Sequence, residues 1–171
     1  MTTATPISQL SGDFRRAFRG HPAGVAIITA RGSEGPVGLT SSSVVSIAAD
    51  PPILGFSLQS DRGSAAVIGS ATSFLVHLLT AENASLARLF ATPGTRRFGP
   101  DMAWSTLATG EPLIHGTGHV LRCTPLSGVQ AGPATVLTAA VEDVLEPENL
   151  GAPLVYQDRK YHCVSPWTVL T

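Results

Sequence analysis

The stretch PVGLTSSSVVSIAADPPIL, residues 36–54, runs from one apolar segment to the next through a dense group of hydroxyl side chains. The β-branched and apolar residues within 37–47 predict extended backbone on both sides of this group. Asp50, Pro51 and Pro52 predict a turn, because proline fixes its own backbone and disfavours helix at the preceding residue. Residues 53–58 (ILGFSL) predict a second strand, so two strands flank a polar loop.

The hydroxyl group of this loop is its most unusual feature. It consists of Thr40, Ser41, Ser42, Ser43 and Ser46. A buried hydroxyl without a hydrogen-bond partner is costly, so these side chains should face a polar ligand, water or their own turn. A flavin offers suitable partners, because its ring edge presents donors and acceptors and its phosphate needs several donors. The alternative is a serine-rich loop satisfied by its own backbone.

The rest of the chain predicts a mainly β protein with short helices. Phe14, Ala17 and Phe18 recur at helical spacing, and we expect this first helix to lie across one end of a barrel. Thr80 predicts the N-cap of a helix that ends near Ala91. One or two helical turns are predicted at 63–69, and strands at 25–30, 74–79, 120–123, 135–144 and 154–164. Without regular alternation of strands and helices, the pattern favours an antiparallel barrel over a doubly wound sheet.

Length and composition limit the organisation and the partners. The 171 residues suit a single domain, 1–171, with residues 1–12 expected as a flexible N-terminus. Only 13% of residues are charged while 43% are hydrophobic, which favours association, and we expect a homodimer. Eleven basic and twelve acidic residues leave no basic excess for nucleic acid or an anionic membrane. Without a signal peptide or a long apolar run, we expect a cytoplasmic protein.

Several common active-site signatures are absent from the sequence. It contains no GxGxxG, Walker loop, GxSxG elbow or HExxH. His115 and His119 have the spacing of two metal ligands on a helix, but Gly116 and Gly118 favour strand or loop, so we predict no metal site. The two cysteines lie far apart and form no CxxC pair.

Several blocks resemble the flavin reductase-like family in their order and spacing. They are GHPAGVAIITA (20–30), the stretch 36–54, SFLVHLLTAENASLARLFA (73–91), RRFG (96–99) with Trp104, and PLVY (153–156) with Tyr161. The resemblance covers residues 14–164, and GLTSSS followed by DPP is its specific part. It implies an FMN-binding split β-barrel, a homodimer with flavin near the subunit interface, and NADH or NADPH as hydride donor. Such short-chain reductases supply reduced FMN or FAD to a partner monooxygenase.

The resemblance also implies which residues contact the flavin. One segment lines the isoalloxazine ring, a second meets the ribityl phosphate, and a basic-aromatic pair borders the flavin. The ring-lining segment supplies Val37, Gly38, Thr40, Ser41 and Ser42, and Ser57 follows the next strand, where the family turns toward the flavin. The residues near the phosphate are Ser60, Arg62 and Ser64, and the basic-aromatic pair is Arg97 and Phe98. A solvated Arg97 and a core Phe98 are the alternatives. Hydride transfer is chemistry of the two cofactors, so we assign no catalytic nucleophile or proton donor, and the backbone N–H groups of 40–42 are expected to stabilise the reduced flavin.

One departure from the family concerns the nicotinamide donor. Many members carry Gly-Asp-His before the penultimate strand, where this chain has Gly132, Pro133 and Ala134. Donor contacts would then come from elsewhere, and His21, Arg159 and Tyr161 are the candidates, with His21 as a simple loop residue the alternative. The departure leaves two other functions open: a flavin-binding or flavin-carrying protein without efficient nicotinamide oxidation, and a split barrel for haem or a deazaflavin.

Overall fold

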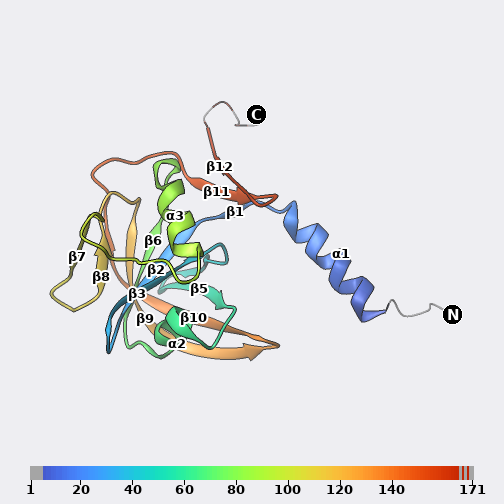
Figure 1. Cartoon of the computed structure of the whole chain (residues 1–171), viewed down its shortest axis with the longest axis horizontal. Helices are drawn as coiled ribbons and strands as arrows, with labels where there is room; N and C mark the ends of the chain where they lie inside the picture. Colours follow the sequence, from blue (N-terminus) through green and yellow to red (C-terminus); the bar gives the residue numbers. More distant parts are fainter. Residues whose placement is uncertain (1–5, 166, 168, 170–171) are drawn as a thin grey trace.

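The computed structural model describes residues 6–165, 167 and 169, and a curved antiparallel sheet forms its centre (Figure 1). The sheet has seven strands in the order β3-β2-β6-β9-β10-β5-β4. Their bounds are β2 Ala26–Gly32, β3 Gly35–Ser41, β4 Val45–Ala49, β5 Pro52–Leu58, β6 Phe74–Leu78, β9 Val120–Ala131 and β10 Ala134–Leu145. Every pairing in it is antiparallel, which confirms the predicted fold class.

Smaller elements surround this sheet. A three-stranded sheet joins β1 Ala23–Gly24, β11 Leu154–Gln157 and β12 Lys160–Cys163, and a two-stranded sheet joins β7 Trp104–Thr106 and β8 Pro112–Ile114. The helices are α1 Ile7–Arg19, α2 Gly63–Ser70, a 3-10 turn η1 Ala81–Asn83 and α3 Ala84–Ala91. Among the described residues, no helix has both the length and the apolar character needed to span a membrane.

Strand β2 separates two hydrophobic cores, because its alternating side chains point to opposite faces. Ile28 packs with Phe56 and Phe74 in the first core, beneath α2. Ile27 packs in the second core with Phe90 of α3. The sheet is therefore covered on both sides where β2 and β3 run beside the helices.

Buried His77 connects strands within this framework. Its Nδ1 lies 3.2 Å from the carbonyl oxygen of Ile27, and its Nε2 accepts a hydrogen bond from the N–H of Ile114 at 3.0 Å. These contacts require a neutral imidazole with its proton on Nδ1. Burial lowers the pKa of His77 from 6.5 to about 4.

Most predicted elements are confirmed with small shifts at their ends. The stretch 37–47 forms β3 and β4, separated at residues 42–44 within the hydroxyl group. Thr80 is the N-cap of η1, and its N–H donates to Asn83 Oδ1 at 2.9 Å, so the predicted helix starts with a 3-10 turn that continues into α3. The helix ends at Ala91, as predicted.

Near the C-terminus the prediction of one strand at 154–164 is wrong. Strands β11 and β12 form a hairpin there, with Tyr156 opposite Tyr161. The turn residues Asp158 and Arg159 have φ angles of 48° and 61°, the left-handed conformation of a tight hairpin turn. Because this turn contains no glycine, its sequence gives little sign of the reversal.

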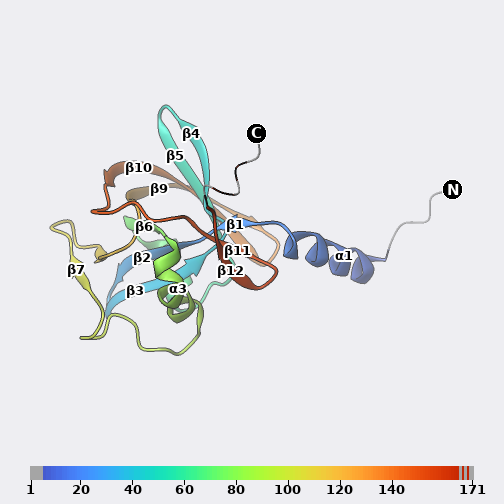
Figure 2. The ribbon, with the colours of Figure 1, turned by 90° about the horizontal axis from the view of Figure 1, so that it is seen from above.

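The N-terminal helix also differs from its prediction. Helix α1 begins at Ile7, so residues 7–12, expected to be flexible, are helical, while residues 1–5 lie outside the described part. The helix does not lie across the barrel. Figures 1 and 2 show it projecting away from the body, and none of its residues is buried. Its aromatic residues therefore face outward, and not into the core that the helical spacing had suggested.

Candidate functional site

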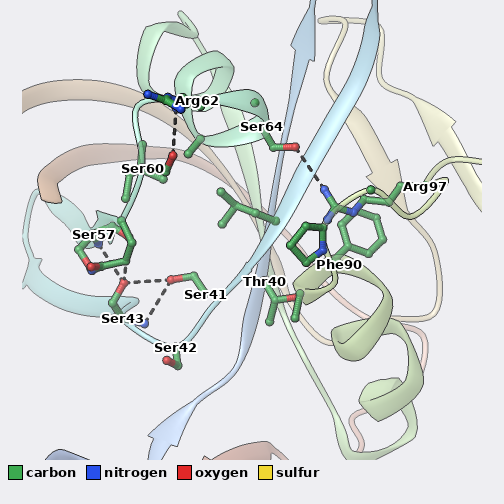
Figure 3. Close-up of a pocket in the computed structure, with 18 residues that line it drawn as sticks. Thr40, Ser41, Ser42, Ser43, Ser57, Ser60, Arg62, Ser64, Phe90 and Arg97 are labelled. Carbon is green, nitrogen blue, oxygen red and sulfur yellow. Dashed lines mark hydrogen bonds between the residues drawn. The ribbon is translucent and has the colours of Figure 1, made fainter. Parts of the chain in front are cut away.

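A cavity of about 640 Å³ opens where β3 and β5 end and where α2 begins. Its other wall comes from α3 and the loop that follows it (Figure 3). The volume lies within the usual range for small-molecule and cofactor sites, roughly 300–1,000 Å³. The lining residues are Leu39, Thr40, Ser41, Ser42, Ser43, Ser57, Leu58, Gln59, Ser60, Arg62, Gly63, Ser64, Ala65, Phe90, Ala91, Pro93, Gly94 and Arg97.

The hydroxyl loop forms one wall of this cavity. Ser43 Oγ lies 2.9 Å from Ser41 Oγ and accepts the N–H of Ser57 at 2.9 Å, so it connects the end of β3 to β5. Thr40 Oγ1 donates to the carbonyl of Ala87 at 2.7 Å and connects β3 to α3. Each of these three hydroxyls thus has a partner within the protein.

Ser42 differs from its neighbours. In the part of the chain that the structure describes, its hydroxyl makes no hydrogen bond, and it stands apart from the Ser41–Ser43–Ser57 chain in Figure 3. Ser57 Oγ accepts a hydrogen bond from Gln59 Nε2 at 3.0 Å on the same wall. Ser46, also without a hydrogen bond among the described residues, does not line the cavity, so Ser42 is the unbonded hydroxyl of this group that faces it.

The opposite end of the cavity is suited to an anion. Ser60 Oγ accepts the N–H of Arg62 at 3.1 Å, which shapes the approach to α2. The Arg62 side chain is 92% exposed, and Asp61 lies 3.8 Å away as its ion-pair partner. The first residues of α2, Gly63 to Ala65, line the cavity, and the first turn of this helix contains no acidic residue. Free N–H groups at a helix N-terminus together with a mobile guanidinium are a typical phosphate site.

Arg97 holds three walls of the cavity together. Its Nη1 donates to the carbonyl of Gly38 at 2.7 Å and to Ser64 Oγ at 3.3 Å, and its Nη2 donates to the carbonyl of Thr92 at 2.9 Å. The guanidinium lies 5.5 Å from the ring centroid of Phe90. Burial lowers its pKa from the ordinary value. Its Nε is buried without a partner among the described residues, which leaves one donor in the wall unsatisfied.

Three predicted flavin contacts support the cavity without lining it. Val37 packs against the first core. At Gly38 a Cβ atom would lie 2.6 Å from Phe90 Cε1, so only glycine lets α3 approach β3 this closely. Phe98 packs edge-on between Phe90 and Trp104, with ring centroids 5.4 and 5.2 Å away, as its core alternative described.

The three candidate donor contacts lie together at the base of α1, outside the cavity of their own chain. His21 follows α1 and lies 6.0 Å from the Phe18 ring, and Arg159 is in the β11–β12 turn. Tyr161 on β12 lies under the guanidinium of Arg88 at 5.2 Å, and burial raises its pKa.

Several lining residues were not among the predicted contacts. Ser43 belonged to the hydroxyl group and could have been included on that signal. Phe90, Pro93 and Gly94 reach the cavity because α3 packs on β3, which no local pattern indicates. His115 borders a second cavity of about 610 Å³, and His119 Nε2 pairs with Glu146 at 2.8 Å.

Comparison with known proteins gives this site its context. A family profile described as "Flavin reductase like domain" matches residues 18–165. The chain belongs to the flavin reductase-like family. An NADH:FMN oxidoreductase of Rhodococcus qingshengii is 35% identical over 159 residues, which cover 91% of this chain and 83% of that protein.

Solved structures of family proteins agree. A flavin reductase domain protein from Arthrobacter sp. FB24 superposes with a TM-score of 0.83 at 30% identity, covering 91% of this chain and 96% of the other. The styrene monooxygenase flavin reductase from Pseudomonas putida S12 has a TM-score of 0.79 at 28% identity, with 90% and 97% covered. The family resemblance inferred from the sequence and the flavin reductase split-barrel fold are both confirmed.

Proposed function

We propose that this chain is an NAD(P)H-dependent flavin reductase, which passes hydride from a reduced nicotinamide to FMN or FAD held in the 640 Å³ cavity. The observation that carries the proposal is a cavity with a hydroxyl-rich wall at one end and an exposed arginine beside a helix N-terminus at the other, in a chain of this family. A flavin nucleotide has the matching chemistry, because its ring edge hydrogen-bonds and its tail is anionic.

The residues present fit such a group. Ser42 and the backbone of 40–42 would face the ring edge, and Arg62 with the N-terminus of α2 would hold the phosphate. The unpartnered Nε of Arg97 adds a donor beside this space. The flavin supplies the hydride-accepting chemistry when bound, and the chain's residues orient the ring and favour its reduced, anionic form through N–H donors. The proposal therefore requires no side chain acting as acid or base.

We also propose a homodimer with two-fold symmetry, supported by the outer face of the sheet. Ser57 pairs with Val136, which pairs with Val129, so these three side chains project from one face. Leu54 and Phe56 point to the opposite face, into the core. The exposed valines thus lie on the face of the sheet that carries cavity residue Ser57 and leave an apolar surface for a second copy to cover. A light-scattering mass of one chain at micromolar concentration would contradict the homodimer.

A second copy would also account for the donor contacts. His21, Arg159 and Tyr161 do not line the cavity of their own chain, so we propose that they meet a nicotinamide bound at the cavity of the partner. Reduced flavin would leave for a separate monooxygenase, as expected for a relative of a styrene monooxygenase reductase. We propose a cytoplasmic location for this exchange.

The decisive experiment measures NADH and NADPH oxidation by the purified chain with added FMN or FAD. We expect oxidation that depends on flavin. Flavin binding without oxidation of either nicotinamide would favour the flavin carrier, the alternative that the Gly132-Pro133-Ala134 sequence leaves open. An absorbance spectrum typical of haem or a deazaflavin would favour the third function.

A further inference from the structure

Helix α1 carries an apolar stripe that joins neither hydrophobic core of the described residues. Ile7, Leu10, Phe14 and Phe18 recur every three or four residues and are exposed by 83%, 58%, 59% and 60%. No residue of the helix is buried. An isolated 13-residue helix is marginally stable in water, and most helices in proteins are stabilised by packing of one face. The described part of the chain thus leaves the stripe uncovered.

The base of the helix is fixed to the body. The N–H of Asp158 donates to the carbonyl of Arg19 at 2.8 Å, and Gln157 Nε2 donates to the carbonyl of Gly20 at 2.7 Å. Arg19 and Asp158 also form an ion pair. With its base held at the β11–β12 turn, a helix of 13 residues extends about 20 Å from the body. The projecting position is therefore specified by contacts within the chain.

The body presents a second exposed apolar surface. Val45 and Ile47 on β4 are exposed by 57% and 53%, and Val129 and Val136 on the β9–β10 hairpin by 62% and 41%. In Figure 1 this hairpin and α1 both extend to the right of the body. With full side-chain areas of roughly 150–250 Å² for phenylalanine, Phe14 and Phe18 alone expose about 180–300 Å². The six aliphatic side chains add to this apolar area, and a standard stable interface covers about 800 Å² per partner.

We propose that α1 is an arm that packs its Ile7–Leu10–Phe14–Phe18 stripe on a second copy of this chain, while the arm of that copy packs on the first. The inference rests on the proposed homodimer and adds the element that holds it together. The opposite net charges of the helix and of the rest of the chain agree with this occupant. The helix contains three arginines and one aspartate, whereas the rest of the chain contains eight basic and eleven acidic residues. A membrane surface would cover the arm but leave the exposed sheet face in water, and a second copy covers both.

Two variants of the full chain test the arm. Leu10→Glu with Phe14→Glu places two carboxylates in the stripe, and Ser8→Glu with Gln9→Glu places the same charges outside it as a control. Because no residue of α1 is buried, the monomer of each variant should stay folded and unfold at the same temperature as the natural monomer at low concentration. Sedimentation velocity over a concentration series should show a dimer dissociation constant raised at least 100-fold by the first pair and less than threefold by the control.

The outcomes separate the arm from the dimer and from the activity. A dimer unchanged by Leu10→Glu with Phe14→Glu would overturn the arm and leave the homodimer in place. A natural chain that is monomeric throughout would overturn both, and its binding to anionic vesicles would then assign α1 to a membrane. Should the charged pair fail to fold, Leu10→Ala with Phe14→Ala must still weaken the dimer at least tenfold, or the arm is wrong. Flavin-dependent NADH oxidation by the natural chain tests the proposed function separately.

Discussion

Arg62 and Arg97 both border the cavity, yet their contacts predict opposite behaviour toward the flavin phosphate. Arg62 is 92% exposed and lies beside the first turn of α2. The terminal N–H groups of Arg97 donate hydrogen bonds to Gly38, Ser64 and Thr92 of its own chain. Riboflavin lacks the phosphate of FMN but shares its ring, so comparing the two ligands separates a phosphate contact from a role in holding the cavity.

Arg62→Gln should weaken FMN binding and leave riboflavin binding unchanged. A charge-assisted hydrogen bond contributes about 1.5–3 kcal/mol, and the exposure of Arg62 places its contribution near the lower end, about tenfold in Kd. The difference should shrink as salt screens the exposed charge. Fluorescence titration measures the Kd of both ligands, and Arg96→Gln, at the exposed residue before Arg97, serves as the control.

Arg97→Gln should weaken FMN and riboflavin by the same factor and lower stability by about 2–3 kcal/mol, because it breaks three hydrogen bonds, one of them to the carbonyl of buried Gly38. Lysine should restore only part of either loss, since its single ammonium cannot reach three walls in the planar geometry of guanidinium. If Arg62→Gln weakens riboflavin as much as FMN, or if Arg97→Gln spares riboflavin, the assignment of the two arginines is wrong.

Ser42→Ala should weaken FMN binding by about 1–2 kcal/mol in a folded variant, and an unchanged Kd would return Ser42 to a structural role. Gly38→Ala should displace the Phe90 ring and weaken flavin binding. An unchanged Kd for FMN and an unchanged melting temperature would show that the ring can move aside without cost. Ala134→His should lower the KM for NADH by about fivefold, roughly 1 kcal/mol, at saturating FMN; a micromolar KM in the natural chain would show that other residues have taken over this contact. Because the folded chain lowers the pKa of His77 to about 4, the unfolded chain binds more protons between pH 4 and 6.5. The free energy of unfolding should therefore fall by about 3 kcal/mol from pH 7 to 4. Urea titrations at several pH values should show this fall for the natural chain and not for His77→Gln.

Sequence patterns indicated lining residues of the cavity where neighbouring residues on one loop or turn supply its wall. That these residues contact a flavin stays a prediction. Thr40, Ser41 and Ser42 stand together in a break between two strands, and the hydroxyl density marks them without any tertiary information. Ser60 and Arg62 precede a helix start, which is again a local signal. For Ser41, however, the sequence could not distinguish a ligand contact from a hydrogen bond within the chain. Its hydroxyl bonds that of Ser43, which is held in place by the backbone N–H of Ser57, and neither contact can be read from the sequence.

Prediction failed where the deciding contact is long-range or where the backbone conformation has no compositional sign. Phe90 enters the cavity wall because the absence of a side chain at Gly38 lets α3 approach β3. Asp158 and Arg159 reverse the chain without glycine. The periodicity around Phe14 and Phe18 correctly indicates an amphipathic helix, but it does not reveal whether its apolar face packs on its own chain or on another.

The proposed nicotinamide site must lie beside the proposed flavin site. Hydride transfer requires the donor ring to lie against the flavin ring, so donor contacts must reach the cavity where the flavin is proposed to sit. In this chain the Gly132-Pro133-Ala134 turn does not line that cavity, nor do His21, Arg159 and Tyr161 at the base of α1. If those residues contact the donor, they do so from a second copy, whose position the arm and the exposed sheet face would fix. Loss of the dimer should then raise the KM for NADH more than the Kd for FMN, because the flavin cavity is built within one chain and the donor contacts are not.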